Sequence, residues 1–368
     1  MPKQIQKKVI LCISNDIHTD QRLHKVCTSL MGLNYNVELL GRKLQTSKTL
    51  GKPYACKRLS ILFNKGALFY AFLNIQFFIY LLFKATDIIV ANDLDTLPAC
   101  HFASKLRGKK LVVDLHELFT EVPEVVNRKR IQKFWASIEG YFLPKNDRMI
   151  TVCKSIADYY DEKYNKTVEV VRNIPVKKEL YQTTKKSNDQ FIILYQGAVN
   201  IGRGIETMVE TIQHLPEKYS LWIIGSGDIS DSIKEQIKDF NLEHRIKMFG
   251  RKEPSELKKI TPQAHLGLSL EENMGLNYYF ALPNKLFDYL HADVPMLVSP
   301  FPEMSAIVNQ YNTGYIRRST SAKGLAIEIE TIANNQSLYQ EKVSACKQTK
   351  RHLTWENEFK IYQKVLES

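Results

Sequence analysis

The sequence has few cysteines, and they are not clustered. Six occur in 368 residues, without a C-x-x-C pair or a Cys/His cluster. This scatter excludes the common zinc motifs and a disulfide framework, so we expect reduced thiols and a cytoplasmic protein. The cysteines are Cys12, Cys27, Cys56, Cys100, Cys153 and Cys346.

Two N-terminal signals are also missing. The apolar run before Asn15 and Asp16 has about six residues, fewer than the roughly 7 to 15 of a signal-peptide core. No G-x-G-x-x-G follows the first predicted strand, Val9 to Ser14, which disfavours a nicotinamide or flavin dinucleotide fold. A hydrophobic content of 44% with 24% charged residues is typical of a folded globular protein, and the length predicts two domains.

Acidic residues are absent from residues 41–65, here called the basic segment. Residues 1–180 contain 29 Lys and Arg but only 17 Asp and Glu, so the whole net charge of +12 lies in this half. The basic segment holds seven cations: Arg42, Lys43, Lys48, Lys52, Lys57, Arg58 and Lys65.

An apolar, aromatic-rich stretch, Ala67 to Phe83, follows the basic segment. Its 17 uncharged residues are at the lower limit for a membrane-spanning helix. A fully buried crossover helix is a second interpretation. We favour a third, a helix partly buried on a sheet with one aromatic edge available to an anionic membrane surface. Nucleic acid is not expected as a partner, because the aromatics form one apolar block instead of interleaving with cations.

Predicted strands and helices alternate through both halves, which indicates βα units on parallel sheets. A polar linker, Thr183 to Asp189, separates the two series. The fold class is therefore α/β, with two Rossmann-like, doubly wound domains. Ligands of such sheets bind at the carboxyl ends of the strands, so the residues that follow each strand are the candidate site residues.

The segment 266–299 predicts a strand, a loop, a helix and a buried strand. From Pro283 onward the apolar residues fall at helical spacing, whereas Asn284, Lys285 and Asp288 share the other face. An anion near the helix start would meet free N–H groups and an ammonium group. Asp288 could accept hydrogen bonds from a ribose diol. The alternative is a surface ion pair between Lys285 and Asp288.

A second candidate is the glycine-rich turn GAVNIGRGIE after Gln196. Gly197 and Gly204 could let backbone N–H groups cradle a phosphate, and Arg203 would add a fixed positive charge. A plain tight turn is the alternative.

The stretch LPNKLFDYLHADVPML resembles the donor-site helix of GT-B glycosyltransferases of the retaining family-4 type, the glycosyl transferases group 1. The resemblance implies two Rossmann-like domains facing a cleft, with residues 1–180 binding the acceptor and residues 190–350 binding the nucleotide sugar. It also implies that residues 351–368 form a helix returning to the first domain. Here the basic segment and apolar stretch, about 41–84, would face a membrane.

The sequence departs from the family at the donor site. The family carries two glutamates eight residues apart; here the second is Asp288, and Phe280 stands eight residues before it. Either Glu271 or Glu272 could take the first role and orient the transferred sugar. The family's G-R-x-x-x-x-K-G turn has Ala198 in place of its arginine, so Lys285 is expected to supply the second charge beside Arg203.

The resemblance assigns further residues to each side of the reaction. On the donor side it implies Gly225, Arg251 near the nucleobase, and Leu286. On the acceptor side it implies Asp16, Asp20, Arg22, Asp93 and Glu117. His116, in the stretch DLHE, would contact an acceptor hydroxyl or the donor sugar; the alternative is a structural histidine.

No metal or other cofactor is expected. Asp93-Leu94-Asp95 resembles the metal-binding signature of a different transferase fold, but we interpret Asp95 as a helix N-cap.

The implied function is transfer of a sugar from a UDP- or GDP-linked donor to a glycan or lipid-linked acceptor, with retention of anomeric configuration, in cell-surface polysaccharide synthesis. The enzyme would be peripheral on the inner face of the cytoplasmic membrane. Two alternatives remain: a sugar-nucleotide epimerase or hydrolase of the same fold, and a non-catalytic membrane-docked subunit of a polysaccharide assembly complex.

Overall fold

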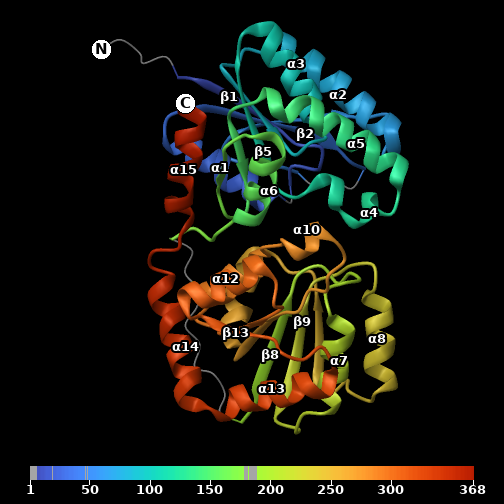
Figure 1. The fold of residues 1–368 in the computed structure, drawn as a ribbon, viewed down its shortest axis with the longest axis vertical. Coiled ribbons are helices and arrows are strands. Elements are labelled where there is room, and N and C mark those ends of the chain that lie inside the picture. Colours follow the sequence, from blue (N-terminus) through green and yellow to red (C-terminus); the bar gives the residue numbers. More distant parts are fainter. Residues whose placement is uncertain (1–5, 19, 46, 48, 178–180, 182–188) are drawn as a thin grey trace. The chain divides into compact units, whose positions relative to one another are not determined.

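The computed structural model describes residues 6–18, 20–45, 47, 49–177, 181 and 189–368 (Figure 1). The chain forms two compact units. The first comprises residues 1–173 and 355–368, and the second comprises residues 174–354.

The first unit contains a seven-stranded parallel sheet with the order β3-β2-β1-β4-β5-β6-β7. The order reverses between β1 and β4, as in other doubly wound sheets. Buried Val, Ile and Leu side chains dominate β1, β4 and β5, because helices cover both faces of the central strands. The strands are β1 (Lys8–Cys12), β2 (Asn36–Lys43), β3 (Ala55–Ser60), β4 (Ile88–Asn92), β5 (Lys110–Leu115), β6 (Met149–Thr151) and β7 (Val168–Val170).

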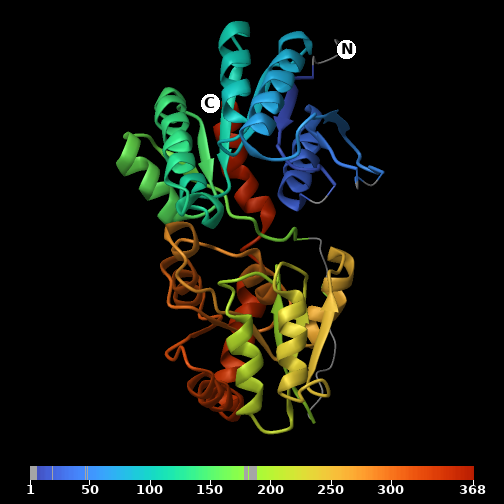
Figure 2. The same cartoon turned by 90° about the vertical axis from the view of Figure 1, so that its right-hand side faces the viewer.

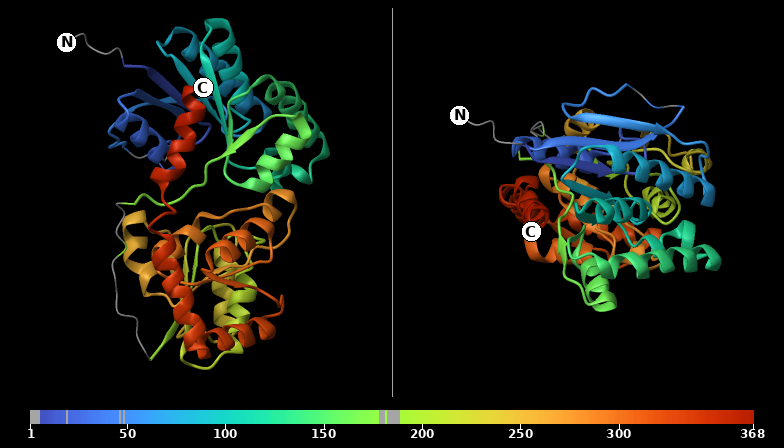
Figure 3. Two further views of the ribbon diagram at one scale, coloured as in Figure 1. Left: turned by 60° about the vertical axis from the view of Figure 1, so that its left-hand side comes forward. Right: turned by 90° about the horizontal axis from the view of Figure 1, so that it is seen from above.

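The helices of this unit include one from the far end of the chain. α15 packs on α1, β6 and β7, so the predicted return of the C-terminal helix to the first domain is confirmed (Figure 3). The helices are α1 (Gln21–Gly32), α2 (Gly66–Phe83), α3 (Leu97–Arg107), α4 (Pro123–Val126), α5 (Lys129–Phe142), α6 (Lys154–Tyr164) and α15 (Trp355–Glu367), with short 3-10 turns η1 (Phe119–Glu121) and η2 (Leu143–Lys145).

Helix α2 is the predicted apolar helix. One stripe at four-residue spacing is buried, and α2 lies beside α3 (Figure 2). By length and composition α2 could cross a membrane, and 22% of it is buried. The buried stripe is Phe69, Leu73, Phe77 and Leu81, and the most exposed apolar residues are Leu68, Ile75, Ile79 and Phe83.

The basic segment contributes an edge strand that the sequence pattern did not predict. Residues 41–43 complete β2, and β3 pairs with β2 in parallel register. Charged residues interrupt the alternation of apolar and polar residues along β3, because an edge strand buries few side chains. Lys48 lies outside the described residues.

One detail of the first unit differs from the prediction. Asp95 does not cap α3; that helix begins at Leu97 after Thr96, and no side chain caps it. Asp95 is buried instead, with 5% of its surface exposed.

The second unit contains a six-stranded parallel sheet with the order β10-β9-β8-β11-β12-β13. One core cluster packs α7 and α13 on one face, and another packs α11 and α12 on the other. The strands are β8 (Phe191–Gln196), β9 (Tyr219–Ile224), β10 (Ile246–Gly250), β11 (Leu266–Ser269), β12 (Met296–Val298) and β13 (Gly314–Ile316). The helices are α7 (Ile205–Gln213), α8 (Ser230–Asp239), α9 (Pro254–Ile260), α10 (Leu276–Tyr279), α11 (Asn284–His291), α12 (Pro302–Tyr311), α13 (Ala322–Asn334) and α14 (Gln336–Thr349), with the 3-10 turn η3 (Thr261–Gln263).

Tyr289 anchors α11 to the sheet. Its buried hydroxyl accepts a hydrogen bond from the N–H of Gln196 at 3.1 Å and lies 3.1 Å from the carbonyl of Leu268. The ring lies against Gly267, where an added Cβ would approach it to 2.4 Å. The small residue on β11 therefore sets how closely α11 approaches the strand ends.

We expect Gly267→Ala to lower the free energy of unfolding by about 1–3 kcal/mol, because the new methyl group would overpack a buried ring. Urea unfolding followed by tryptophan fluorescence measures this change. Gly140→Ala is the control, since no atom lies within 4 Å of a Cβ at that helical position. Equal stability of the two variants would contradict the packing argument.

Candidate functional site

Three segments of the second unit converge at the carboxyl ends of β8 and β11. They are the turn after β8, the residues after β11, and the start of α11. The charged side chains that meet there are Arg203, Glu271 and Lys285, here called the Glu271 cluster.

Glu271 is the centre of the cluster and is fully buried. The Nζ of Lys285 lies 2.8 Å from its Oε1, and Nη1 of Arg203 lies 3.7 Å from the same oxygen. Ser269 donates a hydrogen bond to Oε2 at 2.7 Å. Burial raises the pKa of Glu271, but Lys285, Ser269 and Arg203 together lower it below its ordinary value. The carboxylate is therefore ionised, and the cluster keeps one positive charge in excess.

Aromatic rings fix the positions of the two cations. The guanidinium of Arg203 lies 4.6 Å from the ring centre of Tyr278, and the Lys285 ammonium lies 4.2 Å from that of Tyr195. Such contacts stabilise a cation without neutralising it. Lys285 is 7% exposed, so the alternative of a surface pair with Asp288 is wrong.

The start of α11 faces the same region. Pro283 precedes the helix in an extended conformation, and no side chain caps the first turn of α11. The helix dipole adds partial positive charge there. Asn284 is exposed at the first helical position. Leu286 is different: its side chain is in the core and its N–H bonds the Pro283 carbonyl, so neither is offered to a ligand.

Asp288 lies one turn further along α11. Its Oδ2 accepts a hydrogen bond from Nε2 of Gln196 at 2.7 Å, and its Oδ1 accepts one from the Tyr181 hydroxyl at 3.2 Å. Gln196 in turn accepts a hydrogen bond from the buried Thr261 hydroxyl at 2.9 Å. The carboxylate is thereby oriented at the end of β8.

The structure separates the two adjacent glutamates. Glu271 lies among the cations, whereas Glu272 is exposed and its backbone N–H donates to the Gly202 carbonyl at 2.9 Å. Of the two residues that the sequence left open, Glu271 is therefore the one that contacts Arg203 and Lys285.

The glycines allow close approach between loops. Gly225 has φ 148°, and a Cβ there would lie 1.7 Å from the Gly197 carbonyl oxygen. Gly204 has φ 70° and approaches the Leu270 carbonyl similarly, with a Cβ at 2.4 Å. Arg251 is exposed after β10, two strands away from β8. The glycine turns thus bring Arg203 beside the end of β11.

The predicted acceptor-side residues form a second charged group in the first unit, here called the His116 cluster. Arg22 donates to both oxygens of Asp114 at 2.8 and 3.2 Å and to the Val171 carbonyl at 2.8 Å. The two ring nitrogens of His116 lie 3.4 Å from Asp93 and 3.4 Å from Asp114. Arg22, Asp93, Asp114 and His116 therefore belong to one network.

The network sets the charge of His116. Burial alone lowers its pKa, but Asp93 and Asp114 raise it to about 9, so the ring is cationic at neutral pH. Burial likewise raises the pKa of Asp114, yet Arg22 and His116 lower it to about 2. His116 keeps 19% of its side chain exposed, whereas Arg22 and Asp114 are almost completely buried.

The other predicted acceptor-side residues lie outside this network. Asp20 caps α1 by accepting from the N–H of Leu23 at 2.8 Å. Asp16 accepts from the Ser47 hydroxyl at 2.7 Å and lies 3.4 Å from Arg58. Glu117 is partly exposed next to His116. Asp16 and Asp20 thus have local structural contacts.

Sequence reasoning missed several residues of these clusters. Gln196 is the last residue of β8, and Arg317 directly follows β13. Both lie at the carboxyl ends of strands, where ligands of such sheets bind, so this rule could have found them. Burial lowers the pKa of Arg317, which has Glu272, Glu328 and Glu271 as charged neighbours. Tyr195 and Tyr278 carry no sequence signal for their contacts with cations.

Metal ligands do not gather in the part of the chain that the structure describes. No group of three or more His, Cys, Asp or Glu side chains there could hold a metal ion.

The two parallel α/β units, with strand orders β3-β2-β1-β4-β5-β6-β7 and β10-β9-β8-β11-β12-β13, have the GT-B fold. Residues 176–352 match the family model of glycosyl transferases group 1. This part, just under half of the chain, is similar to that family, and the protein is a glycosyltransferase that transfers a sugar from a nucleotide sugar.

Solved structures have the same fold. Sucrose-phosphate synthase from Thermosynechococcus elongatus aligns with a TM-score of 0.79 and 15% identity over 98% of this chain and 99% of its own. HepE from Anabaena, in complex with UDP and glucose, aligns with a TM-score of 0.75 and 13% identity over 98% of this chain and 99% of its own. WaaG, a glycosyltransferase involved in lipopolysaccharide biosynthesis, aligns with a TM-score of 0.67 and 11% identity over 94% of this chain and 96% of its own. No curated protein matches the chain.

The His116 cluster predicts a pH dependence. Because the pKa of His116 is raised to about 9 in the folded state, its stabilising contribution is complete below the unfolded pKa near 6.5 and is lost as pH rises through 9. We expect the free energy of unfolding to fall by about 3 kcal/mol between pH 6 and pH 10 because of this group. Urea unfolding at both pH values measures the change.

His116→Gln removes the titrating ring and should abolish this component. His244→Gln is the control, since His244 is 62% exposed and its Nε2 lies 3.5 Å from Glu217. The same pH dependence in wild type and in both variants would contradict the assignment.

Proposed function

We propose that the protein transfers a sugar from a UDP- or GDP-linked donor to a glycan or lipid-linked acceptor, with retention of configuration and without a metal, in cell-surface polysaccharide synthesis. The observation that carries the proposal is the meeting of Arg203 and Lys285 at one oxygen of Glu271. Two fixed cations and one buried carboxylate leave a positive charge that suits a diphosphate.

The leaving nucleotide diphosphate gains negative charge as its bond to the sugar breaks. Arg203, Lys285 and the N–H groups at the start of α11 are positioned before the reaction, so they stabilise that charge without reorganising. Glu271 acts as a positioning residue in this proposal. Its oxygens are already bound by Lys285 and Ser269, and it holds both cations at the donor diphosphate.

Asp288 is the proposed ribose ligand. Gln196 holds one oxygen of the carboxylate, and a ribose hydroxyl would replace the Tyr181 hydroxyl at the other. HepE is described in complex with UDP-glucose, which supports UDP as the first nucleotide to test.

The first unit is proposed to bind the acceptor, with cationic His116 as the contact residue. Asp93 and Asp114 each lie 3.4 Å from a ring nitrogen and orient the imidazolium. Its Nε2 has no hydrogen-bond partner among the described residues and would donate to an acceptor or sugar hydroxyl. WaaG is described as acting in lipopolysaccharide biosynthesis, which supports a glycan or glycolipid acceptor.

Nucleotide binding tests the donor site. We expect Arg203→Ala to weaken UDP binding about 10- to 100-fold, because it removes one charge-assisted contact. The paired change of Glu271→Gln with Lys285→Met should cause a similar loss without leaving an unpaired buried charge. Isothermal titration with UDP and GDP measures both effects.

Lys234→Gln is the charge-matched control, because Lys234 is an exposed lysine of the same unit, paired with Asp231. Asp288→Asn should weaken UDP binding but leave pyrophosphate binding unchanged. Wild-type protein that ignores both nucleotides would favour the non-catalytic subunit. Free sugar released without any glycosylated acceptor would favour the epimerase or hydrolase.

We also propose that the protein is cytoplasmic and binds the inner face of the cytoplasmic membrane through α2 and the basic segment. The two elements are connected: Arg42 lies 4.7 Å from the ring centre of Phe69, and Gln76 donates to the Ser60 carbonyl at 3.2 Å. Exposed apolar side chains beside cations are typical of a surface that binds anionic lipid.

Vesicle sedimentation tests this docking. Changing Ile79 and Phe83 to serine removes two apolar side chains that are 50% and 85% exposed. Changing Lys52 and Lys57 to glutamine removes two charges. Each double substitution should reduce binding to anionic vesicles at least tenfold, because each removed group contributes about 1 kcal/mol to membrane binding. Unchanged sedimentation of both variants would contradict the membrane assignment.

A further inference from the structure

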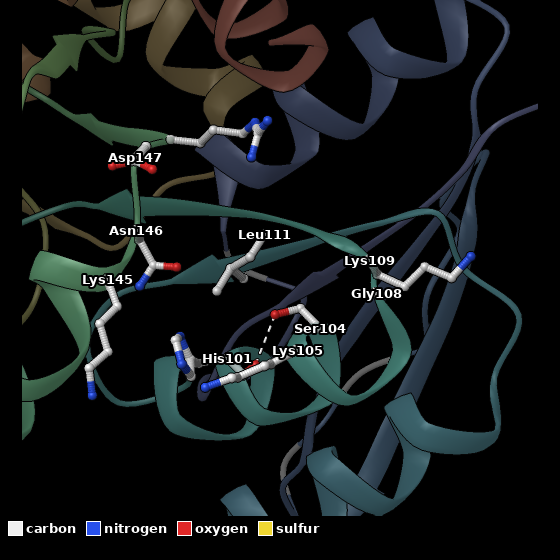
Figure 4. A pocket seen from close by; sticks show the side chains of 10 residues that line it. His101, Ser104, Lys105, Gly108, Lys109, Leu111, Lys145, Asn146 and Asp147 are labelled. Atoms are coloured by element: carbon white, nitrogen blue, oxygen red, sulfur yellow. Dashed lines mark hydrogen bonds between the residues drawn. The ribbon is translucent and has the colours of Figure 1, made fainter.

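A cavity of about 560 Å³ lies at the opposite edge of the first sheet from the His116 cluster (Figure 4). The end of α3 and the turns before β5 and β6 form its wall, at the amino ends of those strands. We call it the basic pocket. The residues that matter for its chemistry are His101, Lys105, Lys109, Lys145, Asn146 and Arg148.

The pocket has a surplus of positive charge. Four of its lining residues are cations, and the single lining acid, Asp147, is paired with Lys166 at 2.6 Å. Lys109 lies 3.5 Å from Asp87, and Arg148 donates to the Ser368 carbonyl at 2.8 Å. Lys105 and Lys145 have no acidic partner among the described residues; the Nζ of Lys145 lies 2.9 Å from the ring centre of Tyr141, a contact that leaves its charge unneutralised.

His101 is an unusual wall residue. It is 8% exposed, and no group in the described part of the chain hydrogen-bonds its Nδ1. The ring packs edge-on against Phe142 at 5.1 Å, which holds it in place. Burial, Lys145 and Lys105 lower its pKa against the opposing effect of Asn146. A buried polar atom without a partner calls for an explanation, and a ligand in the pocket supplies one.

Exposed apolar and aromatic residues next to the pocket are here called the apolar rim: the ring of Phe102 lies 5.8 Å from that of His101, and the ring of Tyr141 lies 2.9 Å from the Nζ of Lys145. Phe102 and Leu106 on α3 are 45% and 70% exposed, and Tyr141 on α5 is 52% exposed. Arg107 connects α3 to the end of α2 by donating to the carbonyls of Leu81 and Lys84. The rim therefore continues toward Phe83 on the face that we propose docks on lipid. A free phosphate ion would not require such a rim.

We propose that the basic pocket binds the terminal phosphate of an anionic lipid headgroup, with Lys105, Lys145 and His101 as its contacts and the apolar rim against the acyl chains. The proposal deepens the membrane docking proposed above and is independent of the donor site. The basic pocket would recognise one headgroup chemistry, an exposed phosphate monoester, in addition to the general attraction of the basic segment to anionic lipid.

Vesicle binding distinguishes recognition from general attraction. Phosphatidic acid and phosphatidylserine are compared in phosphatidylcholine vesicles matched in surface potential. We expect Lys105→Gln with Lys145→Gln to lower affinity for phosphatidic acid roughly 30-fold, from a factor of about five per cation, and to reduce binding to phosphatidylserine much less. The charge-matched control changes Lys154 and Lys234, which are 76% and 62% exposed, to glutamine.

An equal loss on both vesicle types, or no loss on either, would overturn headgroup recognition. All four exposed lysines lie on the surface, so thermal unfolding should be unchanged and misfolding can be checked directly.

A titration with soluble ligands tests the pocket independently of membrane docking. Dioctanoyl phosphatidic acid below its micelle concentration, and inorganic phosphate, are titrated while the imidazole signals of His101 are followed by NMR. We expect the lipid to raise the pKa of His101 in wild type and not in the double-lysine variant.

Such a shift without vesicle binding would refute the docking face but support the pocket. A shift with inorganic phosphate, without any preference for phosphatidic acid vesicles, would assign the pocket to free phosphate and overturn the lipid proposal. No shift with either probe would overturn the pocket itself.

Discussion

The buried carboxylate of Glu271 is the constraint on which the second unit's site depends. A fully buried charge is tolerated only when opposite charges and hydrogen bonds surround it, and here Lys285, Arg203 and Ser269 do so. The requirement acts in both directions. Glu271 holds two cations from segments about 80 residues apart at one point, and those cations keep it ionised.

In the first unit the charges are reversed: a cationic ring is surrounded by carboxylates. Asp93 and Asp114 surround His116 and raise its pKa, while Arg22 neutralises Asp114 from the other side. Each unit thus presents one oriented cationic group, or one pair, at the carboxyl edge of its sheet. A transferase that must bind a diphosphate and contact hydroxyl groups needs such fixed charges, because mobile ones would be screened and would cost entropy to order.

Most of the fold could be predicted because strands and helices alternate with clear hydrophobic periods. The first strand, predicted over Val9 to Ser14, is β1 at Lys8–Cys12, and the helix predicted from Pro283 onward is α11 at Asn284–His291. The edge strand β3 was missed, since cations replace the apolar alternation there. The cap assigned to Asp95 was wrong, because α3 begins two residues later at Leu97 and the Asp95 carboxylate is buried, which local sequence cannot show.

The sequence by itself determined the two parallel sheets, the helix that carries Lys285 and Asp288, and the cationic turn at Arg203, because each depends on local periodicity and strand-end chemistry. Only the tertiary structure decided that Glu271 and not Glu272 meets the cations, that Gln196 holds Asp288, and that His101, Lys105 and Lys145 share a pocket. These pairings join residues far apart in the chain, and packing of side chains across strands and loops, which no local pattern encodes, brings them together.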